Sequence, residues 1–446
     1  MTFHRPIQPV PSEAAVPELS VFVPDLPSFV PDGPDWFSAH RQAERDTGSP
    51  GGRSTSGAID RDALLIKAVR TFERGEVDHA LTALSGLLKL YPDWVDGHMA
   101  MAQLLSQSHS TEALDDFLVT TVRRARGDLD LVTHCLRRLS DGERYQSLAM
   151  LVPEVRSWAG EHLFFTLLEA VAASETDDLD RAHILFARAS AEGGVLSLPH
   201  VRHLLRTGDA VKAATVAEAF VRDQPRNQGA WGLLETAWRL TGDTRHDWLV
   251  DQPGIIRTME VDLSMEALQA LTARLRTLHV ARSHPFDQSL RGGTQTTGNL
   301  FRREEIEIQD ACRALTAAVR AYIDLLPPVD PAHPLLGRAR DSFHFSDSWS
   351  VRLLDGGFHV SHFHPQGVMS SAFYVTLPAL ARSAGHAGWL TIGEPPETLR
   401  TGLPPLQMIE PKVGRLALFP SFLWHGTRPF PRGERMTMAF DTVLED

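Results

Sequence analysis

The spacing of apolar residues changes along the chain, and this change limits the folds available to it. Between about residues 61 and 250, apolar residues recur every three or four positions, which predicts amphipathic helices. From about residue 343 onward they form short runs separated by Gly and Pro, which predicts strands. At 446 residues the chain is long enough for two hydrophobic cores. We therefore expect a helical domain at 61–250 and a β-rich domain at 255–446.

Residues 1–60 have a different composition from the rest. They are rich in Pro, Ser and Gly and lack a sustained apolar period, so we expect a disordered or mobile N-terminal arm.

Charge and cysteine usage exclude several classes of protein. The net charge of −12, with no basic run, argues against a nucleic-acid partner. Two cysteines are too few for a disulfide framework or a thiolate zinc site, which fits a reducing compartment. No apolar run is long enough to span a bilayer. We expect a soluble cytoplasmic protein without a membrane partner.

Two helical segments share a frame of glycine, alanine and proline at equal offsets. The frame is Gly75, Ala80 and Pro92 in the first and Gly208, Ala213 and Pro225 in the second. Gly242 follows Gly208 by 34 residues, and this frame resembles tetratricopeptide repeats. The resemblance implies an α-solenoid whose concave surface could hold a peptide or protein, although the same stack could serve only for homodimer formation or as a rigid support. A generic helical bundle is the alternative, because residues 130–194 keep the frame poorly.

Three histidines in the C-terminal part form a candidate metal site. His362 and His364 lie two residues apart, so on an extended strand both rings point to one face and Phe363 to the other. His425 is the third candidate, at an expected strand end followed by a turn. Imidazoles bind iron, copper, zinc and nickel, so the ligand type leaves the metal open.

The last expected strand contains a candidate carboxylate site. Its period of two places Arg435 and Thr437 on one face, with Met436, Met438 and Phe440 on the other. A guanidinium can hold both oxygens of a carboxylate while a nearby hydroxyl adds a hydrogen bond. Arg352 is a weaker rival for this role.

A candidate metal site and a candidate carboxylate site at this spacing resemble the motif of the 2-oxoglutarate/Fe(II) oxygenases. The resemblance is to a bacterial group in which the oxygenase domain often follows tetratricopeptide repeats. Further sequence segments that carry the resemblance are residues 287–296, 349–353, 388–395 and 419–421. The resemblance covers about residues 255–446. It implies a double-stranded β-helix, a jelly-roll of the cupin kind with flanking helices.

The resemblance also implies the cofactors and their residues. Iron would bind at His362 and His425, and the distal carboxylate of the cosubstrate 2-oxoglutarate at Arg435 with Thr437, with Tyr374 as a further donor. His364 departs from the acidic residue common at that position, so the metal would carry three neutral ligands.

Other polar residues near these candidates have simpler explanations. His359 points away from His362 if the strand is regular, which favours a structural role or one in support of the ligands. His344 and His386 are expected to be non-ligands. Residues 289–298, rich in Gly and hydroxyls, are expected to form a loop.

Three functions fit the sequence. The leading one is a 2-oxoglutarate-dependent hydroxylase that uses dioxygen and acts on a peptide or protein side chain presented by the repeats. The second is a three-histidine, cupin-like metal dioxygenase that does not use 2-oxoglutarate. The third is a catalytically silent repeat adaptor.

Overall fold

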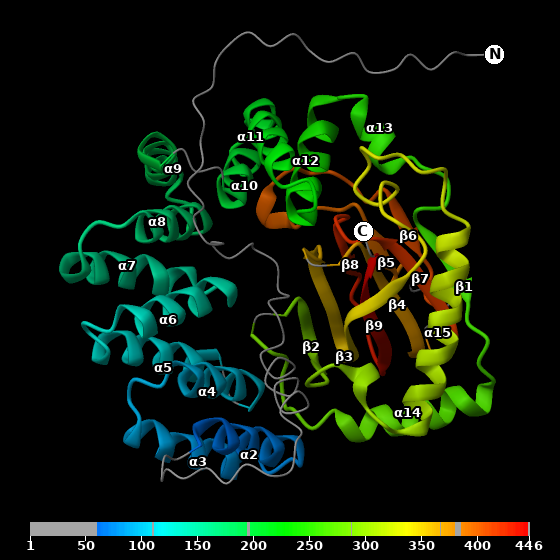
Figure 1. The fold of residues 1–446 in the computed structure, drawn as a ribbon, viewed down its shortest axis with the longest axis horizontal. Helices are drawn as coiled ribbons and strands as arrows, with labels where there is room; N and C mark the ends of the chain where they lie inside the picture. The colour runs from blue at the N-terminus through cyan, green and yellow to red at the C-terminus, as the bar shows by residue number, and fades with distance from the viewer. Residues whose placement is uncertain are drawn as a thin grey trace.

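The computed structural model describes residues 60–108, 111–193, 197–286, 288–365, 367–379 and 385–444. The N-terminal arm expected at 1–60 lies almost wholly outside the described residues. The described chain has a curved stack of helices followed by a sheet with two flanking helices (Figure 1). None of the described helices has the length and apolarity needed to cross a bilayer.

The helical part is a series of antiparallel neighbours. Its helices are α2 (Arg61–Glu73), α3 (Val77–Leu90), α4 (Val95–Ser108), α5 (Thr111–Arg124), α6 (Leu129–Asp141), α7 (Tyr145–Ala159), α8 (Leu163–Glu175), α9 (Leu179–Gly193), α10 (Leu198–Arg206), α11 (Ala210–Asp223), α12 (Gln228–Thr241) and α13 (Arg245–Val250). Helices adjacent in sequence pack against each other along the stack. The prediction of stacked helical hairpins is confirmed, whereas their membership of the tetratricopeptide family stays a prediction.

The residues of the repeated frame occupy equivalent places in two hairpins. Gly75 and Gly208 both have φ near +80°, at +82° and +83°, in the turns before α3 and α11. This left-handed conformation favours glycine. Ala80 and Ala213 are both fully buried, where a small side chain lets two helices approach closely.

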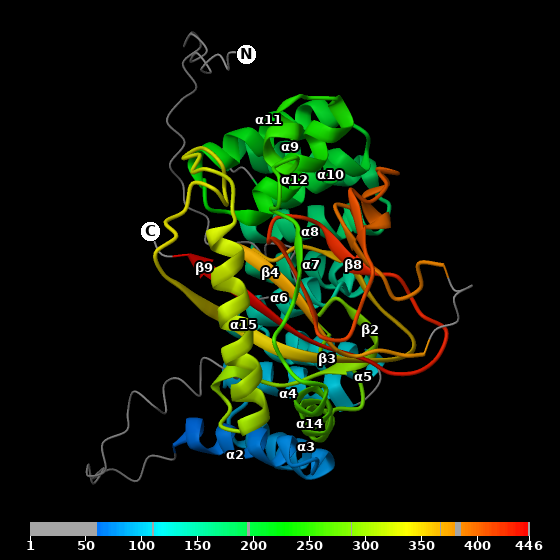
Figure 2. The same ribbon diagram turned by 90° about the vertical axis from the view of Figure 1, so that its right-hand side faces the viewer.

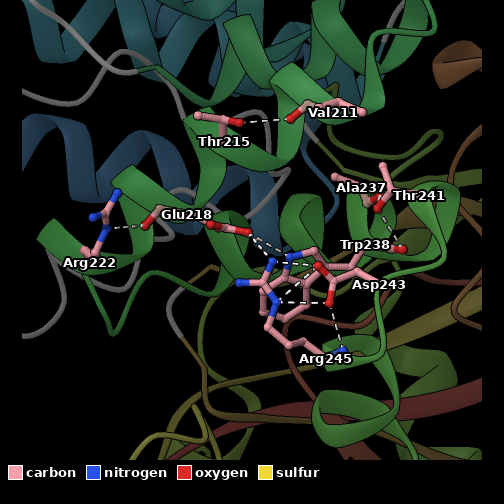
Figure 3. Close-up of polar contacts among 9 residues, drawn as sticks. All are labelled: Val211, Thr215, Glu218, Arg222, Ala237, Trp238, Thr241, Asp243 and Arg245. Atoms are coloured by element: carbon pink, nitrogen blue, oxygen red, sulfur yellow. Dashed lines mark hydrogen bonds and ion pairs between the residues drawn. The ribbon is translucent and has the colours of Figure 1, made fainter. Parts of the chain in front are cut away.

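The α11–α12–α13 corner is held by a cluster of polar contacts (Figure 3). Arg245 donates to Glu218 at 2.7 Å and to Asp243 at 2.6 Å, and its guanidinium lies 4.6 Å from the Trp238 ring centroid. Trp238 Nε1 also donates to Glu218, at 3.0 Å. These contacts join the three helices into one unit, which matters because α12 also packs against the sheet.

The C-terminal part is a curled antiparallel sheet (Figures 1 and 2). Its strands are β1 (Arg257–Glu260), β2 (Leu290–Gln295), β3 (Phe343–His362), β4 (Met369–Thr376), β5 (Leu390–Ile392), β6 (Gln407–Ile409), β7 (Arg415–Pro420), β8 (His425–Thr427) and β9 (Arg435–Leu444). The hydrogen-bonded order is β1-β7-β4-β9-β3-β8-β5-β6, with β2 also on β3.

Two helices cover one face of this sheet. α14 (Met265–Leu278) and α15 (Ile306–Asp324) share a hydrophobic core with β4, β7 and β9 (Figure 2). Met436, Met438 and Phe440 belong to that core, as the period of two in β9 predicted. The curled antiparallel sheet with flanking helices confirms the predicted fold class.

The expectation of a loop at residues 289–298 is wrong, because this segment contains β2. Gly292 has φ +70°, and the pairing with β3 shifts register between Arg291 and Gly293. A side chain at Gly293 would collide with the Arg352 carbonyl oxygen. The glycines therefore permit a bulge and a close approach of two strands.

Candidate metal centre and adjacent pocket

The three histidines singled out by the sequence lie together at one end of the sheet. His362 is the last residue of β3, His364 follows two residues later, and His425 is paired with His362 in the β3–β8 register. One ring nitrogen from each lies within 4.8 Å of the others. Three imidazoles that converge at this spacing are suited to a transition metal.

The local sequence explains why the rings converge. His362 and His364 line a pocket, whereas Phe363 between them is 2% exposed and packs into a hydrophobic core on the opposite side. His425 was expected at the end of a strand, and this is wrong: β7 ends at Pro420 and His425 begins β8. The turn between the two strands brings its ring beside those of β3.

The hydrogen bonds of the three rings select the tautomer that binds a metal. Each Nδ1 faces an oxygen acceptor: the Val360 carbonyl for His362 at 2.8 Å, the Leu423 carbonyl for His425 at 2.9 Å and the Asp441 carboxylate for His364 at 2.6 Å. Since Nδ1 carries the hydrogen, Nε2 carries the lone pair. Burial also lowers the pKa of His362 to about 3 and lowers that of His425, so both rings are neutral.

Asp441 is a buried carboxylate that the sequence analysis missed. It is 5% exposed, and besides its contact with His364 it accepts a hydrogen bond from Ser370 Oγ at 2.7 Å. A carboxylate on Nδ1 fixes the ring orientation and makes Nε2 a stronger ligand. The signal was present, because the period of two that selects Arg435 and Thr437 also places Asp441 on the pocket face of β9.

Arg435 provides a buried positive charge in the same pocket. It is 3% exposed, and no carboxylate lies in ion-pair range of it among the described residues. Its Nη1 donates to Thr427 Oγ1 at 3.0 Å, while Nε has no hydrogen-bond partner. Burial lowers the pKa of Arg435. A buried, unpaired cation is costly, so this place in the pocket is suited to an anion.

Tyr374 lies beside this arginine. The guanidinium of Arg435 is 5.3 Å from the centroid of the Tyr374 ring, and Tyr374 and Thr437 are paired in the β4–β9 register. The Tyr374 hydroxyl is buried, and the Arg435 guanidinium beside it partly offsets the rise in the Tyr374 pKa that burial causes. The hydroxyl finds no acceptor for its own hydrogen among the described residues. A carboxylate placed here would satisfy both this hydroxyl and Arg435 Nε.

A pocket that is partly open to solvent is lined by the three histidines and by Arg435 and Thr437. Arg352, the rival candidate, does not line it and instead donates to Glu434 at 2.6 Å. The structure therefore favours Arg435 as the anion-binding residue.

His359 lies on the pocket side of β3, whereas a regular strand would turn it away. The β3–β8 register shifts between His359 and His362, and this irregularity brings the two rings to a centroid distance of 5.9 Å. Ser289 Oγ lies 3.0 Å from His359 Nδ1 and 3.2 Å from His362 Nε2. His344 is exposed and His386 makes an edge-to-face contact with the Trp389 ring, and neither lines the pocket.

The family model that matches the chain covers most of the sheet. Residues 347–441 match the family model described as "Putative 2OG-Fe(II) oxygenase". No curated protein matches the chain.

Several solved structures are similar over somewhat less than half of the chain. A prolyl-4-hydroxylase from Pseudomonas putida is 18% identical, covers 45% of this chain and 96% of its own, and has a TM-score of 0.31. HygX from Streptomyces hygroscopicus, with nickel, 2-oxoglutarate and hygromycin B bound, is 13% identical over 45% and 86%, with a TM-score of 0.30. AviO1 from Streptomyces viridochromogenes Tue57 is 14% identical over 42% and 89%, with a TM-score of 0.28.

The matched family implies Fe(II) and 2-oxoglutarate, and the donor set of the pocket fits both. Three imidazoles suit a divalent transition metal, and a buried guanidinium without an acidic partner suits a carboxylate. The matched segment begins within β3 and ends at Asp441, so it includes the three histidines and Arg435. The chain therefore carries a 2-oxoglutarate/Fe(II) oxygenase domain at its C-terminal end.

Proposed function

We propose that this protein hydroxylates a side chain of a peptide or protein, and that the helical stack binds this substrate or a partner that carries it. In this proposal His362, His364 and His425 bind the iron through Nε2. The observation that supports the oxygenase chemistry is the presence, in one pocket, of three converging imidazoles and a buried arginine with no acidic partner.

Bound iron and 2-oxoglutarate supply the oxidation: dioxygen is consumed, 2-oxoglutarate is decarboxylated to succinate, and one oxygen atom enters a substrate C–H bond. The chain's own residues orient the cosubstrate and restrict water. Arg435 would hold the distal carboxylate with its planar guanidinium, and the hydroxyls of Tyr374 and Thr437 would donate to the same group. Phe419 and Leu390 form part of the apolar lining beside the histidines.

The placement of the segment between α14 and β2 supports a polypeptide substrate. Gln288 and Ser289 form part of the pocket wall. Shortly before them, the backbone N–H groups of Arg282 and Ser283 both donate to the Gln107 carbonyl in α4, at 2.9 and 3.2 Å. A polypeptide bound to the stack beside this segment would therefore lie near the pocket. Helical stacks commonly bind peptides.

The cosubstrate is tested by anaerobic titration of the metal-free protein with Fe(II) and then 2-oxoglutarate, followed by the visible charge-transfer band. We expect a band that needs both ligands, is lost or strongly weakened in Arg435→Ala, and persists in Arg352→Ala, which removes a guanidinium outside the pocket. Metal-dependent oxygen consumption that Arg435→Ala leaves intact would instead favour a cupin-like dioxygenase that does not use 2-oxoglutarate.

The substrate class is tested separately with a peptide library in the presence of Fe(II), 2-oxoglutarate and air. We expect a peptide to gain the mass of one oxygen atom in step with succinate formation, and we expect no gain with the Arg435→Ala variant. Turnover of free amino acids or other small molecules, with no peptide modified, would contradict the proposed substrate but not the oxygenase chemistry.

A further inference from the structure

We propose that helix α12 of the helical stack positions the two segments that carry the histidines. The geometry of the metal centre would then depend on this helix. This inference rests on the proposed function only in assuming that the three histidines bind a metal. Figure 1 shows α12 at the end of the sheet where β5 and β8 lie.

The residues next to the histidines face α12. Phe363 lies between His362 and His364, and Trp424 directly precedes His425. Both are buried, their ring centroids are 4.4 Å apart, and both belong to a hydrophobic core that also contains residues of α10, α11 and α12. Because neighbouring side chains in an extended segment point to opposite sides, the packing of these two rings determines where the imidazoles point.

Gly232 brings the backbone of α12 against the backbone of the second ligand segment. A Cβ at Gly232 would lie 2.5 Å from the Phe422 carbonyl oxygen and 3.1 Å from the Phe363 ring. Glycine is unfavourable in the middle of a helix, and this close approach is a physical reason for its presence here. Gly229, one turn earlier, would place a Cβ 3.0 Å from the same Phe363 ring.

A buried hydrogen bond fixes the orientation of the tryptophan before His425. Trp424 Nε1 donates to Thr236 Oγ1 at 2.9 Å, and Thr236 Oγ1 in turn donates to the Gly232 carbonyl at 2.9 Å. Thr236 is fully buried, so no water replaces this contact.

The segment after β5 adds a second connection between α12 and Trp424. Arg239 of α12 donates to the Gly393 carbonyl at 2.7 Å, and Gly393 N–H donates to the Trp424 carbonyl at 2.6 Å. Helix α12 thus holds the Trp424 side chain directly and its backbone through Gly393.

The experiment compares two glycine substitutions that both crowd a packed contact. In Gly232→Ala, α12 or the segment at Phe422 must shift. In Gly97→Ala, the new methyl group on α4 collides with the ring of Trp94, the residue just before that helix, in a core cluster that contains no strand residue. Fe(II) affinity is measured anaerobically by competition with a chelator, beside thermal melts of the metal-free proteins. We expect both variants to melt earlier, and only Gly232→Ala to bind Fe(II) about tenfold more weakly, as when a ligand's support is lost.

A second pair of variants guards against Gly232→Ala failing to fold. Thr236→Val keeps the volume but removes the hydroxyl that Trp424 Nε1 donates to, whereas Thr236→Ser keeps that hydroxyl. We expect weaker Fe(II) binding and an altered Co(II) absorption spectrum in Thr236→Val, with both restored in Thr236→Ser.

Three results would overturn the inference. Fe(II) affinities of Gly232→Ala and Thr236→Val equal to that of the wild type would overturn it while leaving the proposed function intact. Equal weakening in Gly232→Ala and Gly97→Ala would assign the effect to general loss of stability. Failure of the wild-type protein to bind Fe(II) would overturn this inference and the proposed function together.

Discussion

Replacing Asp441 by asparagine should weaken Fe(II) binding without unfolding the protein. The asparagine carbonyl can still accept from His364 Nδ1, as the carboxylate does at 2.6 Å. Its amide group can donate to Ser370 Oγ, because that hydroxyl can turn to donate to Ser421 Oγ, 2.9 Å away. The hydrogen bonds are thus preserved, and the substitution removes mainly the negative charge.

The magnitude follows from the charge of the site. Loss of a carboxylate behind a metal-binding histidine typically weakens metal binding roughly 10- to 100-fold, or about 1.4 to 2.7 kcal/mol. Three imidazole ligands contribute no negative charge, and Asp441 is hydrogen-bonded to one of them. It therefore takes over part of the charge compensation that an acidic ligand at position 364 would provide. We expect a loss in the upper half of that range.

The assay is an anaerobic competition titration with Fe(II), with Glu434→Gln as the matched control. Glu434 lies just before β9 and pairs with Arg276 and Arg352 outside the pocket. We expect its neutralisation to lower stability slightly and to leave Fe(II) affinity unchanged. An Asp441→Asn protein that folds normally and binds Fe(II) within about twofold of the wild type would refute the role of Asp441, since even the low end of the expected loss is about tenfold.

Further predictions concern the cosubstrate, the metal and pH. Tyr374→Phe should weaken 2-oxoglutarate binding by roughly the 0.5–1.5 kcal/mol of one hydrogen bond, less than Arg435→Ala does, and titration of the charge-transfer band would measure both. Removing iron with a chelator should lower the melting temperature, since a metal that binds the folded state stabilises it; an unchanged melt would contradict the site. Burial lowers the pKa of His279 to about 3, whereas the pKa of a histidine in the unfolded chain is near 6.5. The contribution of neutral His279 to the free energy of unfolding is therefore fully present above pH 6.5 and is lost as the pH falls from there towards 3. Urea denaturation of the metal-free protein should show stability falling between pH 7 and pH 5, by up to about 1.4 kcal/mol per pH unit for this histidine; a flat profile would count against it.

The period of two predicted the candidate site wherever the strands are regular. It placed Arg435 and Thr437 on the pocket face of β9, and His362 and His364 on the side opposite Phe363. It failed at His359 because β3 shifts register just before the histidine pair. A bulge depends on how two strands pair, so a pattern counted along one strand does not locate it.

Glycines have two opposite structural meanings in this chain, and this explains the wrong prediction of a loop at residues 289–298. At Gly75 and Gly208 the glycines end helical turns with positive φ, as the repeated frame indicated. At Gly292 and Gly293 they let an edge strand approach β3 closely, although the sequence reads as a loop. The difference lies in the partner strand, which is more than 50 residues away in sequence and leaves no local signal.

The helical part and the sheet meet at two apolar side chains whose packing partners the sequence does not predict. Phe363 and Trp424 alternate with the histidines, so the period of two predicts that they are buried, but it does not name what covers them. The structure supplies α12, in which Gly232 removes a side chain at the closest approach. Separating the two parts would expose both rings, at about 1.5–3 kcal/mol for each large apolar side chain, against a total stability of order 5–15 kcal/mol for a folded protein. The helices that were first interpreted as a binding surface thus also help to keep the oxygenase sheet folded around its histidines.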